Sequence, residues 1–289
     1  MSPWFVGVAG TAIVVALALT AAAQQPARRI VSLVPAVTEI LFAFGAGPQV
    51  VAVSSYDDFP PEVKSLPRVG ALLDPDVERI LALRPDLVIS YGSQTDLEGQ
   101  LERARIAVFS YRHAGLDGMF QTIRALGPAT GHQAGSADLA RSVQGQLDAV
   151  RARVQGRPRP RTLLVFERDP TTLRGLYASG GRGFLHEMLE IAGGANLFAD
   201  VQREAVQPSQ ETLLARAPEV IIEVRATGLL PAAGAASDER KAWAALGSIP
   251  AVRNGRIYVL HGDHLVVPGP RVGQGTEAFA RALHPEAFR

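Results

Sequence analysis

The sequence contains no cysteine, and this absence removes several kinds of chemistry at once. Without a thiol the chain can form neither disulfide bonds nor a catalytic thiolate, and it cannot ligate zinc or an iron–sulfur cluster through cysteine. We also expect no lipid anchor on an N-terminal cysteine, and therefore no lipoprotein. Any function must rest on oxygen, nitrogen and aromatic side chains.

Lysine is scarce, with Lys64 and Lys241 as its two occurrences. The 29 basic residues balance 28 acidic ones to a net charge of +1, and no long basic run occurs. Such a chain has no general attraction to the phosphates of nucleic acid, so no nucleic-acid partner is expected.

Signatures of catalysis are missing as well. The sequence has no G-x-S-x-G nucleophile elbow and no G-x-x-x-x-G-K-[ST] phosphate loop, and the glycines of 180–183 lack the spacing of a dinucleotide loop. His186 and Glu187 begin like a zinc-protease motif, but Glu190 stands where the second histidine belongs. We expect no enzyme, and an exported enzyme with an unrecognised site is the rival class.

The first 23 residues are predicted to be a signal peptide. From Trp4 to Ala23 no charged residue occurs, and the run ends in small residues before Gln24. An apolar core followed by an A-x-A site is typical of secretory signals, with cleavage here before Gln24. We therefore expect export to the periplasm. Because the start lacks Lys and Arg and a run of about 20 residues could span a bilayer, a retained anchor is the alternative.

The two halves of the chain share an internal repeat. Residues 76–90 (DVERILALRPDLVIS) align without a gap on residues 209–223 (SQETLLARAPEVIIE). Each copy has apolar residues at helical spacing, then a proline, then a continuous apolar run. Proline cannot continue the helix, and a strand that is apolar throughout is typical of a parallel sheet covered by helices on both faces. Both halves are predicted to be α/β.

One long helix is predicted between these halves. Leu139, Val143, Leu147, Val150 and Val154 recur at spacings of three and four, which predicts an amphipathic helix over 134–156, before the Gly/Pro-rich residues 156–160. The expected fold is α/β, with two Rossmann-like lobes (28–130 and 160–289), this helix joining them and a ligand cleft between them. Further strands are predicted at 30–33, 50–54, 106–110, 162–166 and 257–260, and helices at 38–44, 97–105, 116–126, 184–191, 239–246 and 276–283.

Four motifs occur in order along most of the chain. They are 29–41 (RIVSLVPAVTEIL), 53–60 (VSSYDDFP), 78–88 (ERILALRPDLV) and 193–200 (GGANLFAD). Together they resemble the periplasmic substrate-binding proteins of ABC importers for cobalamin, haem and iron–siderophores, and VSSYDDFP is most similar to the cobalamin binders. The resemblance implies a monomer without a resident cofactor that captures a cobalamin-type corrinoid and delivers it to a permease dimer with its ATPase subunits. Haem, an iron–siderophore or another metal-containing chelate is the alternative ligand.

Candidate ligand contacts follow the predicted strands, because ligands of open α/β sheets bind beyond the carboxyl ends of the strands. Three of them, Tyr56, Tyr91 and Tyr111, have flat faces with a polar tip, which suit a planar ligand such as a corrin or porphyrin. Tyr91 and Tyr111 could instead simply close the edge of the sheet. The other residues at these positions are Pro35, Asp57, Gly92, Arg112, His113, Arg168, Asp169, Arg225 and 261–264.

The resemblance to cobalamin-binding proteins implies a ligand set, residue by residue. Tyr56 and Asp263 match the pattern, and Tyr91 and Tyr177 replace other large aromatics. At four positions the chain departs from it: Leu72, Ala205 and His264 replace tryptophans, and Val267 replaces an arginine. These departures remove aromatic cover and leave a different corrinoid, haem or a metal chelate open. The predicted ligand-binding residues are Tyr56, Leu72, Tyr91, Tyr177, Asp263 and His264.

Three histidines follow predicted strands, namely His113, His261 and His264. They could ligate a metal within the ligand, as could Tyr91, or could be ordinary hydrogen-bonded loop residues. A bare zinc or manganese site would need several ligands converging from both lobes.

Glu78 and Glu211 occupy equivalent positions of the repeat, each in the first turn of its predicted helix. An acidic residue there is favoured by the helix dipole, by about 0.3–1 kcal/mol. The resemblance implies a second role, since one glutamate on each lobe of these proteins contacts arginines of the two permease subunits. A two-fold permease would present the same basic pocket to each lobe, which favours docking.

Overall fold

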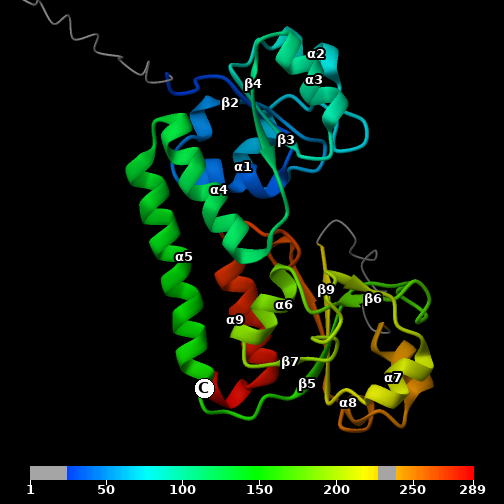
Figure 1. Cartoon of the computed structure of the whole chain (residues 1–289). Coiled ribbons are helices and arrows are strands. Elements are labelled where there is room, and N and C mark those ends of the chain that lie inside the picture. The colour runs from blue at the N-terminus through cyan, green and yellow to red at the C-terminus, as the bar shows by residue number, and fades with distance from the viewer. Residues whose placement is uncertain (1–24, 227–238) are drawn as a thin grey trace, which may run out of the picture.

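The computed structural model describes residues 25–226 and 239–289. The predicted signal peptide, residues 1–23, lies outside these ranges. Two β-sheets form two lobes, and α5 (Gln133–Val154) runs along both of them on one side of the molecule (Figure 1). This confirms the predicted α/β fold with two lobes. In the described ranges, no helix combines the length and apolar character needed to cross a bilayer.

The first sheet has four parallel strands in the order β2-β1-β3-β4. All its carboxyl ends therefore lie at one edge, where Tyr91 and Tyr111 are paired in register as the last residues of β3 and β4. The elements are β1 Ile30–Ser32, α1 Pro35–Ala43, η1 Gly47–Gln49, β2 Val50–Val53, η2 Pro61–Ser65, α2 Val77–Ala82, β3 Leu87–Tyr91, α3 Thr95–Arg103, β4 Ala107–Tyr111 and α4 Gly115–Thr130.

The second sheet is mixed, in the order β10-β9-β5-β6-β8, with β7 paired to β5. Its elements are β5 Arg161–Glu167, β6 Tyr177–Ser179, α6 Phe184–Ile191, β7 Ala195–Asn196, β8 Ala205–Val206, α7 Gln210–Arg216, β9 Val220–Arg225, η5 Glu239–Leu246, α8 Pro250–Arg253, β10 Ile257–His261, η6 Asp263–Leu265, α9 Val272–Leu283 and η7 Pro285–Phe288. β6 and β8 are antiparallel additions that the sequence pattern did not predict. They span three and two residues, too short for a period to show. The predicted helix at 239–246 is a 3₁₀ helix.

Asp169 turns the chain back between β5 and β6. Its Oδ1 accepts hydrogen bonds from the N–H groups of Thr171 and Thr172, both at 2.9 Å, and from the Thr171 hydroxyl at 2.7 Å. This is an Asx turn, and these bonds lower the pKa of Asp169. Asp169 follows a strand, as predicted, but its carboxylate is used within the turn.

The predicted long helix is α5. It follows α4 through Gly131, whose φ of 78° is left-handed and ends α4. The inward face of α5 carries Ala140, Val143, Leu147, Val150 and Val154, all buried. Their spacing of three and four places them on one side of the helix, which packs on α4 and α9.

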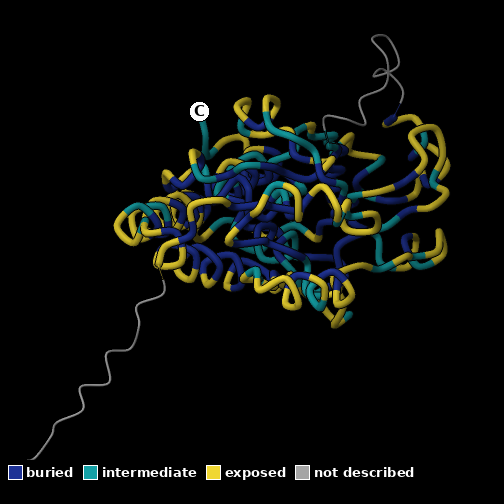
Figure 2. Tube along the Cα trace, turned by 90° about the horizontal axis from the view of Figure 1, so that it is seen from above, coloured by how far each residue is buried: buried dark blue, intermediate teal, exposed yellow. Residues whose placement is uncertain are grey.

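A single hydrophobic cluster runs through both lobes. It connects Ile40 of α1 and Ile123 of α4 to Leu147 of α5, and these to Met188 of α6 and Phe279 of α9. Burying each such side chain stabilises the fold by about 1.5–3 kcal/mol. Buried segments continue through the middle of the molecule in Figure 2. The lobes therefore share packed core and are not tethered by a linker alone.

The repeat in the sequence is also a repeat of backbone geometry. Asp76 and Ser209 are the N-caps of α2 and α7, and each side chain accepts the N–H three residues on, at 3.0 and 3.2 Å. Soon after each helix a non-glycine residue lies in the left-handed region, Arg84 with φ 48° and Ala217 with φ 44°. The two helices thus begin and end in the same way.

Equivalent arginines hold the two helices against their sheets. The backbone N–H of Arg29 donates to Asp86 at 2.9 Å, and that of Arg161 donates to Glu219 at 2.7 Å. Each guanidinium also donates to a carbonyl just after the repeat helix, at 2.7 Å beyond α2 and 2.9 Å beyond α7. Such bonds satisfy carbonyls that a helix end leaves free. The matched anchoring places α2 and α7 equivalently on the two lobes.

Candidate functional site

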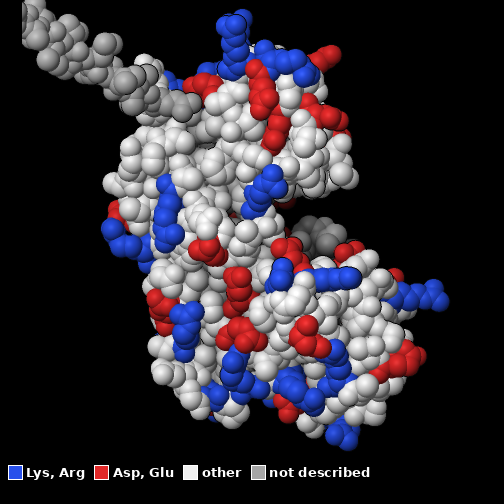
Figure 3. Space-filling model, viewed as in Figure 1, with Lys and Arg blue, Asp and Glu red and all other residues white. Residues whose placement is uncertain are grey.

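The surface is hollowed between the two lobes, on the side away from α5 (Figure 3). A cavity of about 440 Å³ lies there, with a mainly apolar lining that includes His113, Phe166, Phe184, Leu185, Ala205 and Val266. His113 belongs to the first lobe, and the other five belong to the second. A larger hollow of about 650 Å³ lies at the amino ends of β3 and β4, opposite the ligand-binding edge of a parallel sheet.

Four rings form a row from the first lobe into the second. The ring centroids of Tyr91 and Tyr111 lie 6.1 Å apart, those of Tyr111 and His113 6.0 Å, and those of His113 and Phe184 5.6 Å. Every pair is edge-to-face, a favourable arrangement for aromatic quadrupoles. The aromatic row, Tyr91-Tyr111-His113-Phe184, therefore builds one wall across the lobe boundary.

The groups of the aromatic row are neutral at neutral pH. Burial, with smaller contributions from Tyr91 and Glu204, raises the pKa of Tyr111 to about 12. Burial raises the pKa of Tyr91 and lowers that of His113. The Tyr111 hydroxyl lies 3.2 Å from His113 Nδ1. When that hydroxyl donates, His113 carries its proton on Nε2; in the other tautomer Nε2 has a free lone pair.

On the first lobe, the predicted residues Tyr56 and Leu72 lie on loops and Tyr91 ends β3. Tyr56 is 75% exposed, and Leu72 is 41% exposed with its carbonyl accepting a hydrogen bond from Gln94. Of these three, Tyr91 joins the aromatic row. Tyr56 and Leu72 lie outside the row, with exposed side chains.

On the second lobe, Tyr177 lies on β6 and packs against Phe166, with ring centroids 6.3 Å apart. Asp263 and His264 form the start of η6. Burial and nearby Arg271 lower the pKa of His264, which keeps its imidazole neutral.

His261 ends β10 at a separate hollow beside η5, so the structure does not bring the three candidate histidines together. Within the described residues no group of three or more His, Asp or Glu could hold a metal ion.

An ion pair missed by the sequence analysis joins the lobes beside η6. Arg271 donates to both carboxylate oxygens of Glu39, at 2.6 and 2.8 Å, across 232 positions of sequence. Its guanidinium also lies 3.9 Å from the ring centroid of Phe59, a cation–π contact. Burial raises the pKa of Glu39 although Arg271 opposes the shift. No local pattern marks such a long-range pair.

A second contact between the lobes is made by Glu187 of α6, which accepts the Leu116 N–H at 2.6 Å at the start of α4. Gly115 precedes this contact with a φ of 64°, and a Cβ there would lie 2.4 Å from Glu187. Glycine is thus required for the close approach. The two contacts brace the lobes near the cleft.

The turn that carries Tyr56 is held by Asp57. This buried carboxylate accepts hydrogen bonds from the Ser54 N–H at 2.9 Å and the Ser54 hydroxyl at 2.5 Å. Arg68 donates to the carbonyls of Ser54 and Asp57 at 2.9 and 2.5 Å. Asp57, predicted as a strand-end residue, therefore shapes the loop beneath Tyr56.

Asp57 makes stability depend on pH. Burial raises its pKa above the ordinary 3.8, so the unfolded chain releases this proton at a lower pH than the folded chain. Between the two values the folded state binds more protons, and the free energy of unfolding falls as pH rises. Asp57→Asn keeps the acceptor and is expected to flatten the dependence of the free energy of unfolding on pH, measured by urea titrations from about pH 4 upward. A slope unchanged from the wild-type chain would contradict this assignment.

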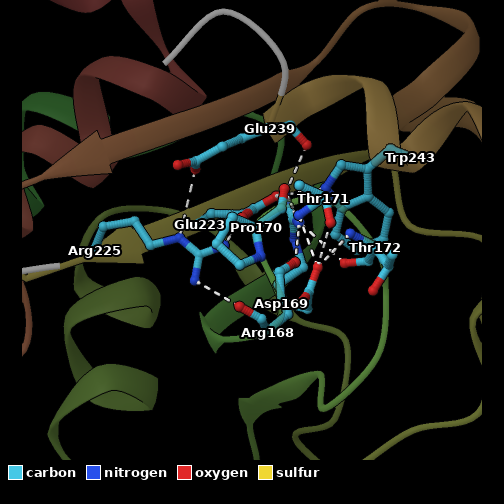
Figure 4. A network of polar contacts seen from close by, with 9 residues as sticks. All are labelled: Arg168, Asp169, Pro170, Thr171, Thr172, Glu223, Arg225, Glu239 and Trp243. Carbon is cyan, nitrogen blue, oxygen red and sulfur yellow. Dashed lines mark hydrogen bonds and ion pairs between the residues drawn. The ribbon is translucent and has the colours of Figure 1, made fainter. Parts of the chain in front are cut away.

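Arg168 and Arg225, predicted as possible cleft residues, are instead buried in a charge network (Figure 4). Glu223 accepts from Arg168 at 2.7 Å, from Arg225 at 2.9 Å and from Trp243 Nε1 at 2.5 Å. Arg225 also lies 3.6 Å from Glu239. Strand ends usually expose their side chains, but here each guanidinium turns inward because Glu223 lies on a fully buried strand.

The Nη1 atom of Arg168 organises the neighbouring loop. It donates to the carbonyls of Asp169, Pro170 and Thr172, at 2.7 to 3.1 Å. Two arginines and two glutamates balance in charge, as buried ions must. The network joins β9 to the loop after β5 and to η5 within the second lobe.

Glu78 and Glu211 lie in the first turns of α2 and α7, as predicted, and the structure shows both to be exposed. The N-caps are Asp76 and Ser209, so neither glutamate is needed as the cap. A hydrogen bond from Ser209 lowers the pKa of Glu211. Both carboxylates are exposed at the surface.

Comparisons with known proteins agree with this geometry. The family model described as periplasmic binding protein matches residues 30–264. The chain is 29% identical to an uncharacterised ABC transporter substrate-binding lipoprotein, YvrC of Bacillus subtilis, over 92% of this chain and 83% of that protein.

Two solved structures show the same fold. Vitamin B12 binding protein BtuF of Vibrio cholerae has a TM-score of 0.75 and 28% identity, covering 91% of this chain and 99% of that one. Haem-binding protein RhuT of Roseiflexus has a TM-score of 0.74 and 29% identity, covering 90% and 99%. The chain belongs to the periplasmic binding protein family, whose members bind their ligands without catalysing a reaction.

Proposed function

We propose that this substrate-binding protein of an ABC importer captures a cobalamin-type corrinoid between its lobes, in the periplasm and as a monomer. The aromatic row beside the apolar cavity carries the proposal, because His113 and Phe184 of the row line this cavity and offer aromatic surface to a large ring system. Tyr56 and Leu72 would cover the ligand from the first lobe, and Tyr177, Asp263 and His264 from the second. The likeness to B12-binding BtuF supports the same ligand.

One departure from the cobalamin pattern, Ala205, leaves room in the cleft. Ala205 lines the cavity where a tryptophan would otherwise fill space. Haem is the alternative, supported by the Nε2 atom of His113 and by the likeness to a haem-binding protein. The raised pKa values of Tyr91 and Tyr111 disfavour tyrosinate ligation of haem iron, since each phenol would first have to lose its proton. An iron–siderophore or other metal chelate would use the same cleft.

Titration distinguishes these ligands. We expect the chain from Gln24 onward to bind cyanocobalamin one-to-one in calorimetry and visible spectroscopy, and Tyr91→Ala to weaken binding at least about tenfold through loss of a buried aromatic face. Tyr258→Ala, near the amino end of β10, is the matched control. Haemin binding with a shifted Soret band, and no response to cyanocobalamin, would show that the ligand is haem and not a corrinoid. If neither compound binds, the remaining candidate ligands are a siderophore or another metal chelate.

The ligand is then delivered to an ABC permease dimer and its ATPase subunits. Glu78 and Glu211 support this step, since two exposed carboxylates on equivalent helices of the two lobes match a partner with two equivalent basic pockets. Neither carboxylate serves as a cap in its own helix. We assign both residues to permease docking.

Closure around the ligand should be small. The shared core through α4, α5 and α9 and the pair Glu39–Arg271 resist rotation of the lobes. Small-angle scattering of the chain with and without a saturating bound ligand is expected to give the same radius of gyration within error. A clear compaction would show that the lobes rotate in spite of these contacts.

A further inference from the structure

Six large apolar side chains are exposed in the parts of the chain that the structure describes. Four of them, Tyr56, Phe59, Leu72 and Leu73, lie on loops of the first lobe. The other two are Leu81 on α2 and Leu214 on α7, exposed by 38% and 42%. Single exposed leucines are common and need no explanation, but these two occupy equivalent positions of the repeat.

Each of these leucines shares a helix face with a docking glutamate. Leu81 follows Glu78 by three residues, and Leu214 follows Glu211 by three. Residues three apart are neighbours on a helix surface. The residue before each leucine, Ile80 or Leu213, is buried and fixes the orientation of the helix.

The frame beneath the two pairs is also equivalent, with an N-cap, a left-handed residue and an arginine anchor at corresponding places in the two lobes. In Figure 1 α2 lies on one lobe and α7 on the other, both on the side away from α5. The molecule therefore presents one acidic and apolar pair on each side of the cleft.

We infer that Glu78 with Leu81 and Glu211 with Leu214 form two equivalent contact patches for the permease dimer, and that each permease subunit offers a cationic side chain beside an apolar surface. This inference rests on the proposed function and adds to it: the leucines would pack against the permease beside the charged contacts of the glutamates. A carboxylate supplies attraction at a distance, whereas a leucine contributes after water is excluded. The glutamates would thus govern the association rate and its salt dependence, and the leucines the dissociation rate.

The partner is first identified by photo-crosslinking in the producing cells. A benzophenone amino acid replaces Leu81, Leu214 or, as the control, Ala149 on the exposed face of α5. The expected result is one and the same integral membrane polypeptide at positions 81 and 214, and none at 149. Different polypeptides at the two positions, or no adduct at either, would overturn the inference.

Kinetics then separate the two roles. With the captured permease in nanodiscs, Leu81→Asn combined with Leu214→Asn should dissociate at least about tenfold faster with an unchanged salt dependence. Ala149→Asn should match the wild-type chain. A leucine variant within twofold of wild type would overturn the inference even if Glu78→Gln with Glu211→Gln associates slowly. If the glutamate variant also binds normally, docking at these helices fails as a whole, and the ligand titration reports separately on capture.

Discussion

Glu223→Ala is expected to lower the free energy of unfolding by about 3–5 kcal/mol, because it leaves buried guanidinium groups without their counter-ion. Glu223 accepts hydrogen bonds from Arg168, Arg225 and Trp243, and its side chain is fully buried. After the substitution Arg225 retains Glu239 at 3.6 Å, whereas Arg168 keeps backbone carbonyls and the Trp243 ring, 5.8 Å away, but no carboxylate. A loss of this size is a large fraction of the 5–15 kcal/mol typical of folded proteins.

Urea unfolding followed by circular dichroism measures this loss. The matched control is Glu277→Gln, which removes a carboxylate from an exposed pair with Arg281, 2.6 Å away, and should change stability by less than about 1 kcal/mol. If Glu223→Ala costs as little as the control, the buried network does not hold the second lobe together. The Arg168 bonds to the 169–172 carbonyls would then have to suffice for that loop.

The fold could be predicted because its signals are local and repeated. Leu139 to Val154 show the period of one helix face, and the gap-free repeat of 76–90 in 209–223 marks a helix followed by a buried strand in each half. The antiparallel strands β6 and β8 gave no such signal. β6 follows the turn at Asp169, where the carboxylate accepts hydrogen bonds from two backbone N–H groups. This turn can be recognised in the sequence only when the end of β5 is already known.

The candidate site could be predicted in part. Ligands of open α/β sheets bind beyond the carboxyl ends of the strands, and this rule identified Tyr91, Tyr111 and His113, three of the four rings in the aromatic row. It missed Phe184, which begins a helix of the other lobe and joins the row by tertiary packing. The same rule placed Arg168 and Arg225 in the cleft, although a single acidic residue within the apolar run of β9 could have signalled a buried partner for them.

The ion pair between Glu39 and Arg271 shows why contacts between the lobes could not be predicted from the sequence. They lie 232 positions apart, and neither has a neighbour in sequence that marks it as half of an ion pair. Only the approach of the loop before α9 to α1, where Gly269 lies beside Glu39, brings the two groups together. Contacts between lobes are therefore the part of this site that requires a structure.

Glu78→Gln combined with Glu211→Gln is expected to abolish most ligand uptake while leaving ligand affinity unchanged. Both residues are exposed on short helices outside the aromatic row, and Asp76 and Ser209 keep the helices capped, so neither the cleft nor the fold should change. A charge-assisted hydrogen bond contributes about 1.5–3 kcal/mol, so losing one on each lobe should reduce uptake at limiting ligand at least about tenfold. Uptake of radiolabelled cyanocobalamin, in a producing strain that carries only the variant, measures the effect.

The comparison that isolates docking is Glu102→Gln with Glu277→Gln, which removes the same charge from α3 of one lobe and α9 of the other. This control should transport normally, because net charge alone does not define a docking geometry. Each single variant should retain part of the uptake, since one lobe would still engage its subunit. Uptake by the double variant within twofold of the control, at equal periplasmic abundance, would show that α2 and α7 are not where the permease binds. A parallel loss of cyanocobalamin affinity would instead place the two glutamates in ligand capture.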